Sequence, residues 1–341
     1  MTDVADEDAR ALLREVVATP SVSGSETAVA ERLQEFFAAH DREAWIDDAG
    51  NLRAPADDAL LLTSHMDTVP GEIPVRVEDD VLWGRGSVDA KGPLVAMAVA
   101  AVQAGVSFVG VVEEETSSAG ARALVEEREA PEALVNGEPS GWASITLGYR
   151  GMLRGEYTVE TAVGHTSRPE PNALQRAMAW WNAVEDAFED PDAPVVEQVT
   201  PKPIEMWGGQ AEDGFAVEAS IDAQFRVPPG SSVAAVKGTV ADLGDGEVAW
   251  SDAIEPVMAS PRNEVAAALR RGIRSLDGEP SHLRKTGTSD MNVFAEAWDV
   301  PMATYGPGDS SLDHTPEEHI DLEDFDRAVA VLTAAAADRR G

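Results

Sequence analysis

Four short apolar runs in the sequence are each followed by side chains that could bind a metal ion or transfer a proton. In chain order, the runs and the residues that follow them are Leu60–Thr63 with His65 and Asp67, Val106–Val112 with Glu113, Glu114 and Glu115, Ala133–Val135 with Glu138, and Met302–Tyr305 with His314. The runs have the length and composition of buried parallel strands. In open α/β sheets, ligands bind beyond the carboxyl ends of the strands. We therefore expect these side chains to converge with Asp89, which precedes a further helix.

Such a convergence of carboxylates requires a cation. The acidic side chains would otherwise repel one another, and some would have to bind protons. One or two divalent ions would remove this conflict. Because the chain has no cysteine, the ligands must be His, Asp or Glu, which fit zinc, cobalt or manganese. Asp89 could bridge two ions, and Asp67 could accept the second N–H of His65 and fix its tautomer.

Each of these groups has a simpler explanation when it is taken alone. An H-x-D pair is usually a surface feature, a run of three glutamates is usually a solvated helix face, and "NGEPS" is an ordinary turn. The combination of four groups at four strand ends favours a site. His319 competes with His314 as a ligand, whereas His40 and His282 are expected at structural or surface positions. The segment "GRGSVDAKG" lacks the ending and spacing of a phosphate loop or dinucleotide fingerprint.

Two sequence patterns predict two domains. Helical segments such as "PLVAMAVAAVQAG", and one capped by Ser25 with Glu26 in its first turn, alternate with the apolar runs. This alternation predicts an α/β domain with a mostly parallel sheet and helices on both faces. Within residues 149–261, half-exposed strands and two helices predict a small β-α-β-β-α-β domain. The expected catalytic domain, residues 1–148 and 262–341, is therefore interrupted by an insert.

The composition excludes several classes of partner. With 62 acidic and 26 basic residues, the net charge is -36, so nucleic acid and anionic membranes are poor partners. No apolar run is long enough to span a bilayer, and the acidic start "MTDVADEDAR" is unlike a signal peptide. We expect a cytoplasmic protein. Because the acidic residues are spread along the chain and repel unless salt screens them, we also expect the salt-rich cytoplasm of a halophile.

Five motifs resemble one known enzyme family. "SHMDTVPG", "GRGSVDAKG", "EEETSSAGAR", "NGEPS" and "GPGDSSLDHTPEEH" are similar to those of the co-catalytic zinc family of aminoacylase, acetylornithine deacetylase, succinyl-diaminopimelate desuccinylase and glutamate carboxypeptidase. The resemblance covers essentially the whole chain and is greatest to the [LysW]-lysine/[LysW]-ornithine hydrolase group. It implies a zinc-exopeptidase-like catalytic domain, interrupted by a ferredoxin-like lid that forms a homodimer.

The resemblance also implies roles for the candidate residues. One zinc ion would be held by His65, Asp89 and Glu138, and a second by Asp89, Glu115 and His314, with cobalt as the alternative metal. Glu114 would be the general base, with Glu113 as a competitor, and Asp67 would complete the catalytic group. The Asp89–Ala90 peptide is expected to be cis.

The lid is expected to supply substrate contacts. The resemblance implies that His165 stabilises the oxyanion, in the site of the partner subunit, and that Asn172 and Arg226 bind a substrate carboxylate. The segment Lys285–Asp290 would line the substrate side.

The resemblance implies an amidohydrolase that acts on linear amide bonds, here releasing lysine or ornithine from a LysW-like amino-group carrier protein in lysine or arginine biosynthesis. The alternatives are an N-acetylornithine deacetylase, a succinyl-diaminopimelate desuccinylase or a related small-molecule deacylase, and a binding protein without catalysis. Because the carrier is expected to be acidic, docking would need a basic patch. The candidates for it are Arg150, Arg154, Arg168, Arg284 and Lys285.

Overall fold

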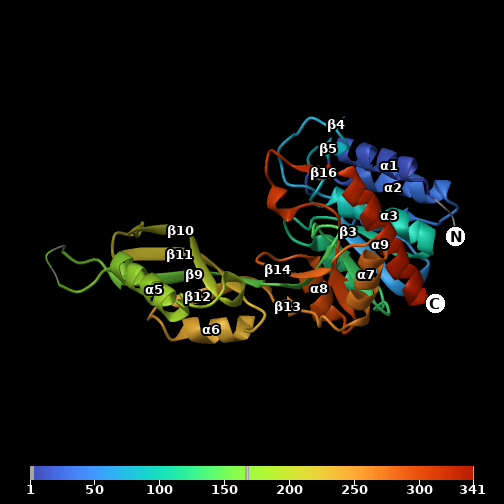
Figure 1. Cartoon of the computed structure of the whole chain (residues 1–341). Helices are drawn as coiled ribbons and strands as arrows, with labels where there is room; N and C mark the ends of the chain where they lie inside the picture. The colour runs from blue at the N-terminus through green and yellow to red at the C-terminus, as the bar shows by residue number, and fades with distance from the viewer. Residues whose placement is uncertain (1–3, 166, 168, 341) are drawn as a thin grey trace. The chain divides into compact units, whose positions relative to one another are not determined.

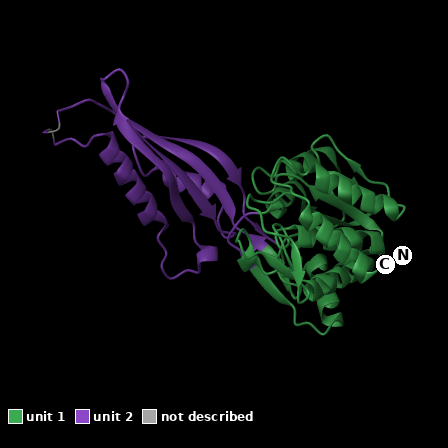
Figure 2. Cartoon of the chain, turned by 90° about the horizontal axis from the view of Figure 1, so that it is seen from above, with its two compact units in different colours: residues 1–147, 259–283, 289–341 green, residues 148–258, 284–288 purple. Residues whose placement is uncertain are grey.

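The computed structural model describes residues 4–165, 167 and 169–340. The chain divides into two compact units, which Figure 2 shows in two colours. Unit 1 comprises residues 1–147, 259–283 and 289–341, and unit 2 comprises residues 148–258 and 284–288. Unit 2 nearly coincides with the expected insert and adds the segment 284–288. This segment belongs to unit 2 because Arg150 donates to the Thr286 carbonyl and Arg284 pairs with Glu197.

Unit 1 is built on a mostly parallel sheet. The strands along its path are, in order, β1 (Trp45–Ile46), β2 (Leu52–Ala54), β6 (Val106–Val111), β3 (Asp57–His65), β7 (Leu134–Gly137), β15 (Met302–Thr304) and β8 (Ser144–Tyr149), with β14 (Ser281–Lys285) paired to β8. The last two residues of β8 belong to unit 2 and pair there with β13 (Val257–Met258). The central strands β6, β3, β7 and β15 are parallel. Every residue of β6 is buried, as expected for a strand covered on both faces.

Helices cover both faces of this sheet. The helices of unit 1 are α1 (Asp6–Ala18), α2 (Thr27–Ala39), α3 (Lys91–Ala104), α4 (Ala119–Glu127), α7 (Glu264–Ser275), α8 (Asp290–Ala297) and α9 (Leu322–Arg340). Helix α3 packs against α1, α9 and β3 (Figure 1), in a core that includes Leu60 and Leu62. Leu61, whose side chain points to the opposite face of β3, is buried outside that core. Helix α4 packs against α8, and α8 packs against β15. Helices thus cover both faces of the sheet, and the α/β prediction is confirmed.

Two short features complete unit 1. The small sheet β16-β5-β4 consists of β16 (His319–Asp321), β5 (Val81–Trp83) and β4 (Arg76–Glu78), and a 3-10 turn, η2, spans Ser310–Leu312. Gly105 is the C-cap residue of α3, and its φ of 71° is left-handed, a conformation that suits glycine. Among the described residues, no helix has the length and apolarity needed to cross a membrane.

Unit 2 has the predicted β-α-β-β-α-β order. Its elements are β9 (Gly151–Ala162), α5 (Ala173–Phe188), the 3-10 turn η1 (Val195–Glu197), β10 (Thr200–Gln210), β11 (Ala216–Val227), α6 (Val233–Ala241) and β12 (Glu247–Ile254). The antiparallel sheet has the order β10-β11-β9-β12, which is ferredoxin-like. Its own core includes Tyr157 and Trp180, whose rings stack 4.2 Å apart.

One predicted helix start is wrong. Helix α2 begins at Thr27 with Glu26 as its N-cap residue, and no side chain makes the capping hydrogen bond. Ser25 is therefore not the cap. The Glu26 carboxylate instead accepts hydrogen bonds from the backbone N–H groups of Gly24 and Glu113. A tertiary contact has thus replaced the local capping interaction that the sequence favours.

Candidate metal centre

The expected ligands follow the strand ends as the sequence indicates. His65 is the last residue of β3, Glu138 follows β7 directly, and the acidic residues 113–115 lie just beyond β6. Asp89 precedes α3, and His314 lies in the loop after η2. Because β6, β3 and β7 are parallel, their carboxyl ends meet at one edge of the sheet.

The structure brings the five expected ligands together. His65 Nε2 lies 3.3 Å from Asp89 Oδ1 and 3.9 Å from Glu138 Oε2. His314 Nε2 lies 3.1 Å from Asp89 Oδ2 and 3.1 Å from Glu115 Oε1. The two carboxylate oxygens of Asp89 thus face two different histidines, which is the arrangement that a bridging carboxylate needs. The Asp89–Ala90 peptide is cis, as expected.

The spacing of the donor atoms fits metal binding. Within the described part of the chain, two groups have ligand atoms within 4.8 Å of one another: His65, Asp89 and Glu115, and His65, Glu114 and Glu138. Ligands at about 2.0–2.2 Å from a tetrahedral ion lie roughly 3.3–3.6 Å apart, so small shifts would close either group around an ion. The second group contains Glu114, so geometry alone leaves this residue as either a ligand or a base.

Asp67 connects the histidine to the acidic loop. His65 Nδ1 lies 3.0 Å from the Asp67 carbonyl oxygen and 3.3 Å from Asp67 Oδ1. Asp67 Oδ1 accepts from the Glu114 N–H, and Oδ2 accepts from the Glu115 N–H and the Ser23 hydroxyl. The carboxylate of Asp67 therefore orients one ligand through its side chain and two acidic residues through their backbone. It is fully buried, which strengthens these interactions.

The geometry separates Glu114 from its competitor Glu113. Glu113 has a left-handed φ of 58°, and its carboxylate accepts a hydrogen bond of 2.8 Å from the Ser117 hydroxyl. Its side chain is absent from both candidate ligand groups, whereas Glu114 belongs to one of them. Of these two residues, only Glu114 therefore has its carboxylate among the candidate ligand atoms.

The electrostatics of the cluster favour a bound cation. Burial, and then the neighbouring Glu138, raise the pKa of Glu114 well above its ordinary value. Burial likewise raises the pKa of Glu138. Burial alone would raise the pKa of Asp89 too, but hydrogen bonds from His314 and His65 lower it. The hydrogen bond to Asp89 raises the pKa of His314 to about 9. Divalent cations would replace the protons that the site otherwise holds.

A family comparison covers all of these residues. Peptidase family M20/M25/M40 matches residues 61–338 of the chain. This span is most of the chain, and it contains His65, Asp89, Glu115, Glu138 and His314. The chain belongs to the M20 family.

Relatives that match over nearly their full length narrow the assignment of this chain within the M20 family. It is 40% identical to the "[LysW]-lysine hydrolase" of Deinococcus radiodurans, over 98% of each chain. It is 27% identical to the "[LysW]-lysine/[LysW]-ornithine hydrolase" of Saccharolobus islandicus, over 95% of this chain and 93% of the relative. The family and these relatives make the chain a metal-dependent amidohydrolase.

Solved structures of other proteins share the fold. Aminopeptidase PepT from Bacillus cereus superposes with a TM-score of 0.81 at 20% identity, over 99% of this chain and 100% of that one. YXEP from Bacillus subtilis, described as a dinuclear metal binding peptidase of the M20 family, superposes with a TM-score of 0.73 at 13% identity, over 98% of each chain. At these identities the likeness supports the fold.

The expected lid residues of this M20 chain lie in unit 2 and differ in their surroundings. His165 is exposed, with Nδ1 2.8 Å from the Ser167 hydroxyl. Asn172 is the N-cap residue of α5, where it forms a capping box with Gln175, so its side chain already has a structural partner. Arg226 Nη1 is buried and has no hydrogen-bond partner among the described residues. A buried, unpaired guanidinium N–H is a candidate contact for a carboxylate.

The basic residues proposed for carrier docking are mostly engaged elsewhere. Arg150 is buried and donates to the carbonyls of Val195 and Thr286 and to the Thr200 hydroxyl. Two others form ion pairs, Arg154 with Asp222 and Arg284 with Glu197. Arg168 lies outside the described residues. Arg150 is therefore a structural residue and not part of a docking surface.

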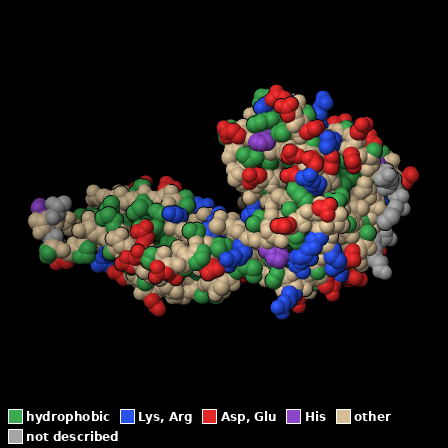
Figure 3. Space-filling model, viewed as in Figure 1, with side chains coloured by type: hydrophobic (Ala, Val, Ile, Leu, Met, Phe, Trp, Pro, Cys, Tyr) green, Lys and Arg blue, Asp and Glu red, His purple; other side chains and the backbone are tan. Residues whose placement is uncertain are grey.

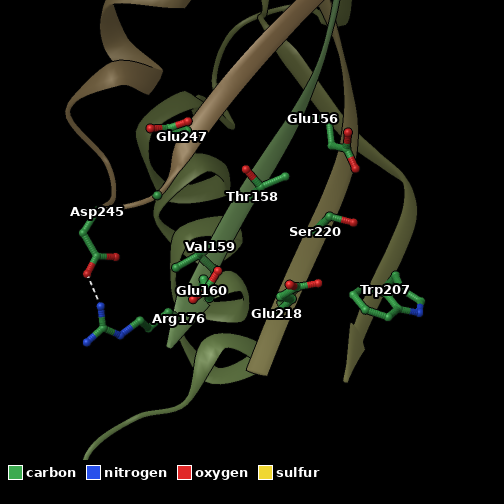
Figure 4. Close-up of a pocket in the computed structure, with 12 residues that line it drawn as sticks. Glu156, Thr158, Val159, Glu160, Arg176, Trp207, Glu218, Ser220, Asp245 and Glu247 are labelled. Carbon is green, nitrogen blue, oxygen red and sulfur yellow. Dashed lines mark hydrogen bonds and ion pairs between the residues drawn. The ribbon is translucent and has the colours of Figure 1, made fainter. Parts of the chain in front are cut away.

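Unit 2 also has a cavity that contains none of the candidate ligands. It has a volume of about 650 Å³ and is lined by Glu156, Glu160, Glu218 and Glu247, by Trp207, and by the ion-paired Arg176 and Asp245, among others (Figure 4). The labelled side chains come from the sheet and from α5, except Asp245, which lies in the loop before β12. The cavity is acidic but lacks histidine, so it does not compete with the cluster in unit 1 as the catalytic centre.

Sequence reasoning missed several residues around the M20 centre. Ser23 and Glu26 hold Asp67 and Glu113, and Glu318 holds the backbone at Asp89. Asp290 was expected on the substrate side, but it is 1% exposed, and burial raises its pKa to about 6. The first three come from loops or helix ends with no periodic pattern, so the sequence offered no signal for them.

Proposed function

We propose that this M20 hydrolase releases lysine or ornithine from an amino-group carrier protein in lysine or arginine biosynthesis. The observation that carries the proposal is the full-length identity of 40% to a relative named for that reaction. The hydrolysed bond would be the amide that joins the α-amino group of the amino acid to a glutamate side chain of the carrier.

The centre would hold two divalent ions. His65, Asp89 and Glu138 would bind one, and Asp89, Glu115 and His314 the other; zinc is favoured, and cobalt is the alternative. The Nε2 atoms that face opposite oxygens of Asp89 support this division. When bound, the ions would supply Lewis acidity at the scissile carbonyl and lower the pKa of the attacking water.

The protein groups would move the proton and hold the substrate. Glu114 would accept a proton from the attacking water at its carboxylate and deliver it to the nitrogen of the leaving amine. His165 would donate a hydrogen bond to the oxyanion, and Arg226 would bind the substrate carboxylate.

The surface of unit 2 supports a homodimer. Strand β10 is at the edge of its sheet, and its Ile204 and Met206 are more than half exposed. Leu174 and Met178 of α5 are exposed too, and α5 packs against β10. An exposed edge strand with apolar side chains readily pairs with another chain. We call these four residues the β10 patch and propose that it is the dimer contact.

The substrate proposal is tested by direct competition. Carrier–lysine, carrier–ornithine and N-acetylornithine are offered at equal concentrations in molar KCl, and the released amino acids are quantified. The carrier conjugates should be cleaved faster, and a Glu114→Gln chain should release little from any of them. A clear preference for N-acetylornithine would assign the chain to the small-molecule deacylases instead.

A further inference from the structure

Glu318 is a buried acidic residue without a role in the proposed chemistry. It lies in "TPEEH", immediately before β16, and is fully buried. The pairing of β16 with β5, through Ile320 and Leu82, fixes the segment that carries it. A buried carboxylate is costly unless donors surround it, so its partners indicate what it does.

Those partners lead directly to the bridging ligand. Glu318 Oε1 accepts hydrogen bonds from the N–H groups of Val88, at 2.9 Å, and Asp89, at 3.1 Å. Its other oxygen, Oε2, accepts from Arg85 Nη1 at 2.7 Å. The Glu318 carboxylate thus binds the backbone of Asp89 and also the side chain of Arg85, near the beginning of the loop that joins β5 to α3.

The same segment also approaches the Asp89 side chain. His314, four residues before Glu318, lies 3.1 Å from Asp89 Oδ2. Asp89 is therefore held at its backbone N–H by Glu318 and approached at its carboxylate by His314. On the other side of the loop, Lys91 Nζ donates to the Thr19 carbonyl oxygen, which fixes the start of α3. The loop is thus held by contacts both before and after Asp89.

We propose that Glu318 is a positioning residue that fixes the backbone of Asp89 and thereby sets the affinity of the centre for its cations. The proposal rests on the dinuclear centre proposed above. Metal ligands depend on the partners that orient them, and removing such a partner typically costs roughly 10–100-fold in metal affinity or activity. Here the oriented group is the ligand shared by both ions, so the effect should extend to both.

Substitution by glutamine is informative because of the donor pattern. The carboxylate accepts on both oxygens, whereas an amide accepts on one side and donates on the other. In Glu318→Gln, either the amide NH₂ faces the Arg85 guanidinium or, after a flip, it faces the N–H groups of Val88 and Asp89. A donor opposes a donor in both orientations. Glu317→Gln is the matched control, because it removes the same charge from the exposed neighbouring residue.

The experiment measures zinc affinity by competition with a chromophoric chelator in molar KCl, starting from metal-free protein. The wild type should bind two zinc ions per chain. If the wild type binds fewer than two, the dinuclear assignment is wrong, and the role proposed for Glu318 is wrong with it. Relative to Glu317→Gln, the Glu318→Gln and Glu318→Ala chains should bind zinc roughly 10–100-fold more weakly.

Measurements on the metal-free protein distinguish a purely structural role of Glu318 from an effect on metal binding. Circular dichroism and a thermal melt without zinc report folding, whereas zinc affinity reports the position of Asp89. Folded Glu318 variants with the zinc affinity of Glu317→Gln would overturn the proposal. If neither Glu318 variant folds, Arg85→Gln decides, because it leaves the Glu318 carboxylate on the backbone and removes its second contact. Its zinc affinity should fall several-fold, and an unchanged affinity would overturn the proposal.

Discussion

At the scale of single residues, the site depends on how neighbouring carboxylates are differentiated. Glu113 and Glu114 are adjacent and chemically identical, but the left-handed backbone at Glu113 directs its carboxylate to Ser117. Glu114 belongs to a candidate ligand group and has its pKa raised by burial and by Glu138. Glu113 thus has a local structural partner, and we expect Glu114 to be the residue that takes part in the chemistry.

This distinction predicts the kinetics of two variants. Glu114→Gln should retain both metal ions and lose roughly two to four decades in kcat, the usual scale for a positioned acid–base group. Glu113→Gln keeps an amide oxygen that can accept from Ser117 and should stay within about tenfold of the wild type. Steady-state kinetics and elemental analysis check both. An active Glu114→Gln chain beside an inactive Glu113→Gln chain would reverse the assignment.

The predictable residues of the centre share one property. His65 ends β3, Glu138 follows β7 directly, and Glu115 lies a few residues beyond β6, so recognition of the strand ends was enough to mark them as candidates. Ser23 and Glu318 could not be found in this way. Ser23 reaches Asp67 across 44 positions and Glu318 reaches Asp89 across 229, and such pairings follow from the folded topology and leave no local pattern.

At the scale of elements, the strands were predicted better than the helix starts. Complete burial gave β6 and the end of β3 a largely apolar composition, which is recognisable in a sequence. The start of α2 depends instead on where the Glu26 carboxylate goes, and it goes to Gly24 and Glu113. Local capping rules cannot include a partner so distant in sequence.

Helix α5 offers a test at this scale. Asn172 forms a capping box with Gln175, so Asn172→Ala should lower the free energy of unfolding by about 1 kcal/mol. Asn172→Ser keeps a capping oxygen and should stay close to the wild type. Chemical denaturation in molar KCl measures both. An equal rise in KM for the two variants, without loss of stability, would instead support the substrate contact that the sequence suggested.

At the scale of the whole molecule, the acidic composition dominates. The visible face in Figure 3 carries Asp and Glu side chains over both units, as 62 acidic against 26 basic residues require. The Debye length falls from about 10 Å at 0.1 M to about 3 Å at 1 M ionic strength. We therefore expect the melting temperature to rise between dilute and molar KCl. A melt that is the same in both would contradict the halophilic assignment.

The proposed dimer can be broken at the β10 patch. Met206→Lys places a charge among apolar side chains that a partner would bury, so sedimentation should show a monomer where the wild type is a dimer. The matched control is Trp207→Lys, because successive strand residues point to opposite faces and Trp207 lines the cavity of Figure 4. Dissociation by both changes, or by neither, would place the contact elsewhere.

A dimer in which His165 serves the partner's site has a kinetic consequence. A Glu114→Gln chain and a His165→Ala chain should each have little activity as homodimers. In a mixed dimer, one of the two sites would combine an intact metal centre from the second chain with an intact His165 from the first. Subunit exchange should therefore restore up to about half of the wild-type activity per mixed dimer, because one of its two sites carries neither change. Mass spectrometry of differently tagged chains confirms the exchange. Exchange without recovery would show that His165 acts within its own chain or has no catalytic role.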